Sequence, residues 1–480
     1  MPARDATGRL ADPDVEDRGG GAVHTQTTAI PAPRLPRSAA GWLRTAAADG
    51  RSLLTLGLLF DGVASYVFLS AAGRDLGPDR FAVVSVLWVV LFLVGNGLFI
   101  PVEQELSRSI AARAARGAGW HSLVRRVSVA SGALLAAALV VTIVTRDRIA
   151  DSLFRGDVTF VWLLMLGLCG MWLMFVLRGA LSGEHHLHAY GLMFAADALA
   201  KAIPGVCLLW WGAMRPSSYG FIVAGSAYVG IAISYAALRF RRRRDAAAAL
   251  PTAAAGPDEP PEWGRLSTSM GFLLLTSFLS ALVINIGTLA IEVVGDRVDA
   301  AKAGIFLSGL VIARIPLFLF QAIQAIVLPR LSRLAALGDF DGFRSDLRRL
   351  NLAMIACTVT ATVAAGAFGP LAVRILFGDE FALLGHRDMA LLTLASMLMT
   401  AALTLNQAQI ALHHQRQTGW PWGIATAAFL AIVATNGRDL FLRVELGMVG
   451  AGTAAVVIVV GLVLLELRHP DEQRIETPTL

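Results

Sequence analysis

The sequence predicts an all-α, polytopic membrane protein with about twelve transmembrane helices in two parallel six-helix lobes. Composition is the first reason: 56% of the 480 residues are hydrophobic, 16% are charged and the mean hydropathy is +0.63. That is more apolar surface than one soluble core can bury. The second reason is a series of apolar stretches near the roughly 20 residues that a membrane crossing requires. The third is an order of short motifs that recurs in the second half of the chain.

Twelve apolar stretches lie between charged or Pro/Gly-rich breaks, and each predicts one span. The eleventh is short and contains Pro421. The predicted spans are residues 52–72, 81–101, 123–145, 159–180, 189–211, 217–238, 267–291, 302–328, 351–370, 389–412, 418–435 and 446–467.

The remaining segments set the predicted boundaries. Residues 1–50 lack an apolar run, which argues against a cleavable signal peptide and predicts a disordered tail. Residues 239–266 are basic and then Pro/Ala-rich, as in a solvated linker. This linker would separate an N-lobe at 51–238 from a C-lobe at 267–468, and residues 469–480 would form a second tail.

Lys and Arg concentrate in alternate loops, such as Arg241 to Arg244 after span six and Arg348 with Arg349 after span eight. Because loops rich in Lys and Arg stay in the cytoplasm, we expect a cytoplasmic (inner) membrane protein with both termini and the linker inside. The formal charge of +6 is spread over these short loops, so it indicates orientation and not nucleic-acid binding.

The internal repeat depends on several short matches in the same order at a nearly constant spacing. "LSR" ends at Arg108 and at Arg333, "LFRGD" at Leu153 matches "LFGDE" at Leu376, and paired histidines precede the fifth and eleventh spans. Six helices in each half make the repeats parallel.

Three segments carry a family resemblance: "GRDLGPDRFAVVSVLWVV" after span one, "RGALSGEHHLHAYGL" between spans four and five, and "AGIFLSGLVIARIPLFLFQAIQAIVLPRLSRL" along span eight. They resemble the multidrug/oligosaccharidyl-lipid/polysaccharide (MOP) exporter superfamily, in particular its polysaccharide-transporter branch of O-antigen flippase-like proteins. The third segment also resembles lipid II flippases, which usually carry fourteen spans. The resemblance implies a V-shaped bundle that moves a lipid-linked sugar or related amphiphile by alternating access.

Charges inside spans are expensive, at about 2.5 kcal/mol or more each near the helix centre, so they mark candidate sites. Asp61 in span one resembles the acid of cation-coupled multidrug members, and either binds Na⁺ or a proton or pairs with a basic residue nearby. Asp197, a second candidate for cation coupling, shares a helix face with Lys201. These two either neutralise each other, or Lys201 binds a phosphate while Asp197 keeps it charged.

Two arginines are further candidates. Arg314 lies near the middle of span eight, two residues before Pro316, and its planar guanidinium suits the phosphate oxygens of a polyprenyl-linked substrate. A buried pair with Asp61 or Asp197 is the structural alternative. Arg178 near the inner end of span four either contributes to substrate binding or extends to the lipid headgroups.

Neutral polar residues within spans are expected either to line a cavity or to bond neighbouring helices. No metal site or cofactor is expected, because the histidines at 185, 186 and 188 lack matching ligands and the cysteines fall inside spans. The candidate cavity residues are Asn96, Asn285, Asn406, Gln407 and Gln409.

We expect a non-enzymatic flippase or exporter of lipid-linked oligosaccharide or polysaccharide precursor. Its expected partners are membrane lipid, a polyprenyl-phosphate-linked glycan and glycosyltransferases of the same pathway, with Na⁺ or proton coupling left open. A cation-coupled multidrug exporter is the alternative, favoured if acids dominate the cavity. A membrane glycosyltransferase or polymerase is disfavoured because every outer loop is short and no catalytic motif is present, and a non-transporting scaffold stays open.

Overall fold

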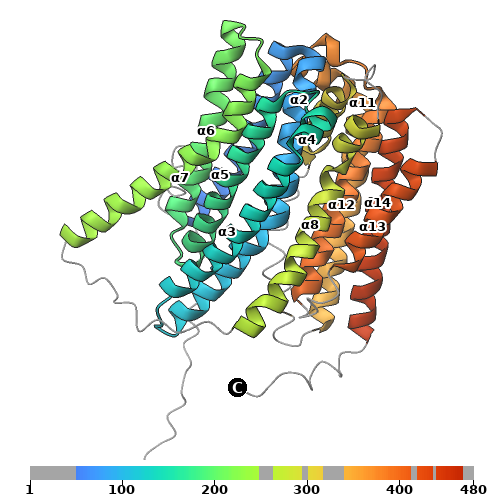
Figure 1. The fold of residues 1–480 in the computed structure, drawn as a ribbon. Coiled ribbons are helices and arrows are strands. Elements are labelled where there is room, and N and C mark those ends of the chain that lie inside the picture. The colour runs from blue at the N-terminus through green and yellow to red at the C-terminus, as the bar shows by residue number, and fades with distance from the viewer. Residues whose placement is uncertain are drawn as a thin grey trace, which may run out of the picture. The chain divides into compact units, whose positions relative to one another are not determined.

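The computed structural model describes residues 50–247, 263–294, 301–316, 334, 340–411, 419–435 and 439–468. Within these residues the chain is helical and forms no β-sheet, so the predicted all-α class is confirmed (Figure 1). The two predicted tails lie outside the described residues, apart from Gly50.

Nine of the described helices are long and apolar enough to cross a membrane, and α9 and α13 are shorter apolar helices. The elements are α2 (Gly50–Ala115), α3 (His121–Val144), α4 (Arg146–Leu153), α5 (Val158–Gly183), α6 (Leu187–Trp211), α7 (Pro216–Ala247), α8 (Trp263–Val294), α9 (Lys302–Ala313), α11 (Phe340–Phe377), the 3₁₀ turn η2 (Asp379–Phe381), α12 (His386–Ala411), α13 (Trp420–Thr435) and α14 (Leu440–Arg468).

Helix α2 contains the first two predicted spans, because the chain reverses at Gly77. This residue has φ 68° and ψ 168°, a backbone conformation available essentially only to glycine. The rings of Phe68 and Trp88 stack with centroids 6.0 Å apart, whereas a straight helix would separate these residues by about 30 Å. Counting α2 as two spans and α9 and α13 as one each, the described residues contain all or part of each of the twelve predicted spans.

Two helix boundaries and one short helix differ from the prediction. Helix α7 continues through the Arg-rich start of the predicted linker, and α11 begins at Phe340, well before the predicted ninth span. Helix α4 is a short helix that hydropathy did not predict. A hydropathy window reports only the lipid-buried part of a helix, so polar extensions and short polar helices escape it.

The helices pack within two groups. Helices α3, α5, α6 and α7 pack around α2, while α8, α9, α11, α12, α13 and α14 pack on one another, and α2 also contacts α8 and α9 (Figure 1). Small residues permit the closest approaches. A Cβ added at Gly191 would lie 2.8 Å from the Leu53 carbonyl oxygen, so α6 lies directly against the start of α2.

Candidate functional site

A buried charge cluster joins the first span to α6. The Lys201 ammonium donates to Asp61 Oδ1 at 2.7 Å and lies 2.8 Å from Asp197 Oδ2. Lys201 and Asp197 are almost fully buried, and the Asp61 side chain is 23% exposed. The ammonium also lies 5.9 Å from the Trp88 ring centroid.

The geometry brings together all three residues that the sequence predicts on these spans. Both structural alternatives hold, because Asp61 pairs with a basic residue of a neighbouring helix and Asp197 pairs with Lys201. With every group ionised, the cluster carries one net negative charge. The Lys201 ammonium can therefore reach a phosphate only if one carboxylate moves away or is neutralised, and the predicted coupling and phosphate-binding roles stay predictions.

Arg314 lies directly after α9, where α8 and α2 are close. Its Nη2 donates to the Ile284 carbonyl oxygen of α8 at 2.6 Å, and the Tyr66 phenol of α2 lies within electrostatic range. Among the described residues no carboxylate lies within ion-pair distance, so the predicted pairs with Asp61 and Asp197 are not formed. A guanidinium has five N–H donors, which leaves Arg314 able to bind an anion.

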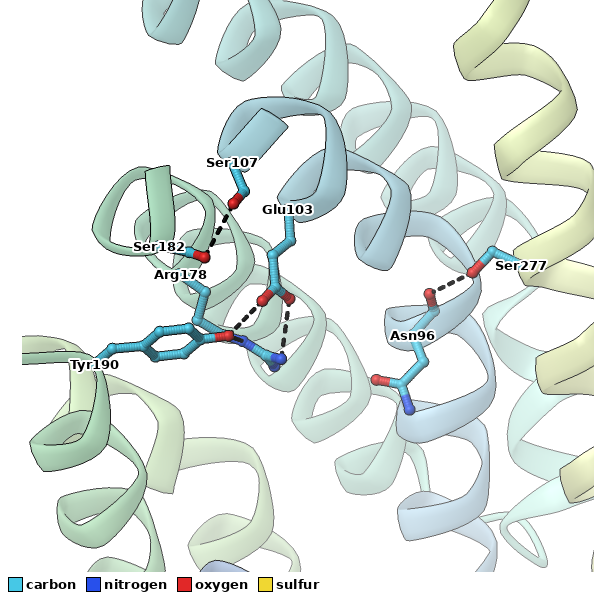
Figure 2. A network of polar contacts seen from close by, with 7 residues as sticks. All are labelled: Asn96, Glu103, Ser107, Arg178, Ser182, Tyr190 and Ser277. Atoms are coloured by element: carbon cyan, nitrogen blue, oxygen red, sulfur yellow. Dashed lines mark hydrogen bonds and ion pairs between the residues drawn. The ribbon is translucent and has the colours of Figure 1, made fainter. Parts of the chain in front are cut away.

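Arg178 belongs to a separate network at the other end of α6. Its Nη2 lies 2.9 Å from Glu103 Oε2 and its Nε donates to the Tyr190 hydroxyl at 3.1 Å, while that hydroxyl donates to Glu103. Figure 2 shows the three side chains converging from α5, α2 and α6. Phe175 and Phe194 cover the guanidinium at 4.4 and 5.0 Å. Arg178 thus points into the protein and not toward headgroups, and its charge is already paired.

Among the neutral polar candidates, only Asn285 uses its side chain in a hydrogen bond that the structure describes. Ser277 of α8 donates to the Asn96 backbone oxygen at 3.1 Å, with the Asn96 amide turned away from this bond (Figure 2). Asn285 donates to the Ala281 carbonyl one turn earlier, and Asn406 is buried with its Oδ1 unpartnered among the described residues. Gln407 and Gln409 lie in α12, but their side chains are outside the described part of the chain.

Sequence reasoning missed several acids that are buried or largely covered by the helices. Glu103 lies just past the predicted end of span two, and Glu445 just before the predicted start of span twelve. Asp75 is buried in the turn region, where it accepts from Tyr219 Oη at 3.0 Å and from the Met214 amide at 3.1 Å. A wider margin around each span would have found the first two.

The two groups of helices are bonded to each other at the Gly77 turn. Arg74 Nε donates to the Leu376 carbonyl oxygen at 2.8 Å. The guanidinium therefore contacts the last turn of α11, where the helix dipole is negative. Further contacts join the two groups at this end. The Ser70 hydroxyl donates to the Leu376 carbonyl oxygen, Arg155 forms a 3.4 Å ion pair with Glu292, and the Phe81 ring centroid lies 6.0 and 5.8 Å from those of Phe377 and Phe381. We call these and the Arg74 bond the Gly77-end contacts.

Two other features of the described residues do not add to this site. No group of three or more His, Cys, Asp or Glu side chains there is arranged to hold a metal ion. An open cavity of about 510 Å³ lies among α5, α6 and α7, lined by Pro204, Cys207 and Phe221 among others, and it is predominantly apolar. It adjoins the turn of α6 after Lys201 without containing the charged cluster.

No family model matches the sequence. Curated relatives include uncharacterized proteins of Mycobacterium tuberculosis and Mycobacterium bovis, each 24% identical over 429 residues that cover 85% of this chain and 90% of the relative.

Solved structures with a similar fold include MATE transporters. An inward-facing multidrug resistance MATE transporter of the MOP superfamily has a TM-score of 0.62 at 16% identity, covering 85% of this chain and 95% of its own. An outward-facing multidrug resistance MATE transporter has a TM-score of 0.57 at 14% identity, covering 89% of this chain and 98% of its own. A Vibrio cholerae MATE transporter in a bent form has a TM-score of 0.58 at 14% identity, covering 89% of this chain and 99% of its own. This chain therefore has the fold of MOP-superfamily transporters, as the resemblance predicted.

Proposed function

We propose that this chain is a membrane transporter that moves an anionic lipid-linked substrate, a lipid-linked oligosaccharide or polysaccharide precursor, by alternating access. The observation that carries the proposal is Arg314, a cation between the two helix groups with a backbone carbonyl and a phenol beside it and no described carboxylate in reach. A guanidinium in such a place binds phosphate oxygens with two parallel hydrogen bonds.

The Asp61 cluster supplies the coupling step of the proposal. A proton or Na⁺ that binds Asp61 competes with the Lys201 ammonium, which lies 2.7 Å from the same carboxylate. Cation binding therefore loosens the contact between Asp61 and Lys201, and the ammonium, still 2.8 Å from Asp197, becomes available to an anionic substrate. This arrangement links the charge state of the first span to the substrate without any further group.

The Gly77-end contacts indicate which state of the proposed transport cycle this structure represents. In the orientation predicted from the basic loops, the Gly77 turn faces outward. Bonds between the two helix groups at that end then close the outer side, so we assign this structure to the inward-facing state. Alternating access requires these contacts to break.

A cation-coupled multidrug exporter is the second candidate, and the observation in its favour is the pair of acids Asp61 and Asp197 within a MATE-type fold. Against it, both acids are occupied by Lys201, and Arg314, which has no carboxylate partner among the described residues, is positive. A cationic drug would be repelled by Arg314.

The test is translocation of a polyprenyl-phosphate-linked sugar in proteoliposomes. We expect Arg314→Ala to reduce the initial rate at least tenfold, because it removes charge-assisted bonds worth about 1.5–3 kcal/mol. Arg148→Ala, which removes an exposed arginine from α4, is the matched control and should leave the rate unchanged. Equal rates for wild type and Arg314→Ala would refute the proposed role.

A further inference from the structure

The strongest unexplained group is Glu445, in the second turn of α14. Its side chain is 0% exposed, and neither carboxylate oxygen has a hydrogen-bond partner among the described residues. The residues one turn before and after it, Phe441 and Met448, belong to the hydrophobic core. Glu445 thus lies on the buried face of α14, in apolar surroundings.

The charged groups that the structure describes around Glu445 do not compensate a carboxylate. On α14 itself, Arg443 forms no ion pair with Glu445, and its Nε is likewise buried without a hydrogen-bond partner among the described residues. On α12, Arg387 and Asp388 lie within electrostatic range, but they pair with each other at 2.7 Å and the Arg387 side chain is 60% exposed. Asp439, just before α14, adds a second negative charge. Of the other elements packed here, α13 has no titratable residue, α8 offers Glu292 and α9 offers Lys302, whose ammonium lies over the Phe441 ring.

Unpartnered hydroxyls lie on the helices that pack against α14. Thr393 and Ser396 of α12 and Thr288 of α8 are buried with no hydrogen-bond partner in the described part of the chain. A Cβ added at Gly452 would lie 2.8 Å from Leu398 Cβ, and one at Gly287 would lie 2.5 Å from Met448 Sδ. The three hydroxyls therefore lie on the parts of α12 and α8 that pack against α14.

An ionised, unpaired carboxylate in such a place would cost several kcal/mol. A protonated one avoids most of that cost, because a neutral carboxyl needs only ordinary hydrogen bonds. We propose that Glu445 is a proton-binding site in the group of helices α8 to α14. Its carboxyl is protonated in this conformation. It releases the proton, on the side of Asp388 and Asp439, when the start of α14 separates from α12. A role of this proton in driving transport rests on the proposed function. The proton-binding site itself does not depend on that function.

The experiment is infrared spectroscopy of the full chain in lipid as a function of pH. We expect a C=O stretching band of a protonated carboxyl at neutral pH that Glu445→Gln removes. Glu105→Gln is the matched control, because Glu105 is equally buried but accepts from Arg108 at 2.6 Å and from Ser109 at 2.7 Å, and it should leave the band intact. A band of the same size in Glu445→Gln would overturn the proposal.

A second readout covers the case in which the band is weak. Unfolding exposes Glu445 to water, where a glutamate loses its proton above a pKa of about 4.3. The folding equilibrium constant of the wild type, relative to Glu445→Gln, is therefore expected to fall about tenfold per pH unit above that value, until the folded site itself loses its proton. Parallel pH profiles of the two proteins would contradict the proposal. Retained translocation in Arg314→Ala together with a lost band in Glu445→Gln would refute the proposed substrate site and leave the proton site standing.

Discussion

The charged side chains between the helices are of two kinds, paired and unpaired. Lys201 and Arg178 each lie within 3 Å of a carboxylate, as expected where an isolated charge is costly. Arg314 and Glu445 have no such partner among the described residues. The paired residues hold helices together, and the unpaired ones are the groups to which we assign ligands.

For single residues, the sequence predicted which side chains contact each other along one helix. It did not identify which residues contact each other between helices. The spacing of Asp197 and Lys201 predicted their contact, because residues four apart share a helix face. The partner of Asp61 depends on how α2 packs against α6. The partner of Arg178 depends on where the reversal of α2 at Gly77 places Glu103. Neither packing can be read from a local pattern.

Removing the Lys201 ammonium should destabilise the protein strongly. Lys201→Met leaves Asp61 and Asp197 facing each other without a cation, a change that typically costs about 3–5 kcal/mol for a buried pair. Unfolding titrations in detergent measure it, and Asp61→Asn added to Lys201→Met should recover part of the loss. Wild-type stability in Lys201→Met would show that the contacts contribute nothing.

The Tyr190 hydroxyl should matter more than its size suggests. It bonds both Glu103 and Arg178, and hydrogen bonds to charged groups contribute about 1.5–3 kcal/mol. We expect Tyr190→Phe to lower the free energy of unfolding by about that amount. Tyr235→Phe, at a tyrosine with 54% of its surface exposed, should change it little, and equal effects of the two substitutions would contradict the network.

Among the elements, α2 is the one whose form depends on a single residue. The apolar runs on either side of Gly77 predicted two spans, and the segment between them carried part of the family resemblance. Pro421 did not prevent α13, because the helix begins at Trp420 and its first turn tolerates proline. The extents of α7 and α11 were missed because helices continue beyond the apolar stretch that identifies them.

Replacing Gly77 should strain this reversal. At φ 68° and ψ 168° any other residue carries about 1–3 kcal/mol of backbone strain, and a Cβ would also lie 3.0 Å from Glu380 Oε2. Gly77→Ala is therefore expected to lower the melting temperature in detergent. Gly423→Ala, inside α13 with nothing within 4 Å of the added carbon, should not lower it. Equal melting temperatures for Gly77→Ala and wild type would refute the strained turn.

For the whole molecule, hydropathy predicted the number of spans and the class of fold, while the contacts between the helix groups were beyond it. Most of the Gly77-end contacts join residues about 300 positions apart, such as Arg74 and Leu376. Such pairs are set by the packing of complete helices. The basic-loop asymmetry still predicts orientation, and the resemblance to the polysaccharide branch still predicts the substrate.

The Gly77-end contacts should control the population of this conformation. Arg74→Ala combined with Arg155→Ala removes hydrogen bonds and an ion pair between the helix groups. Spin labels at the exposed residues Ser152 and Leu383 should then give a distance distribution shifted to longer values in electron paramagnetic resonance. The control is Arg148→Ala, and an unshifted distribution in the double variant would mean that these contacts do not hold the end closed.

The most direct test of the central claim is a side-by-side transport measurement with two substrates in one set of proteoliposomes. The account predicts that wild-type protein translocates a polyprenyl-phosphate-linked oligosaccharide, that Arg314→Ala does so at least tenfold more slowly, and that neither accumulates a cationic drug under a Na⁺ or proton gradient. Gradient-driven drug transport that requires Asp61 and is indifferent to Arg314 would contradict it.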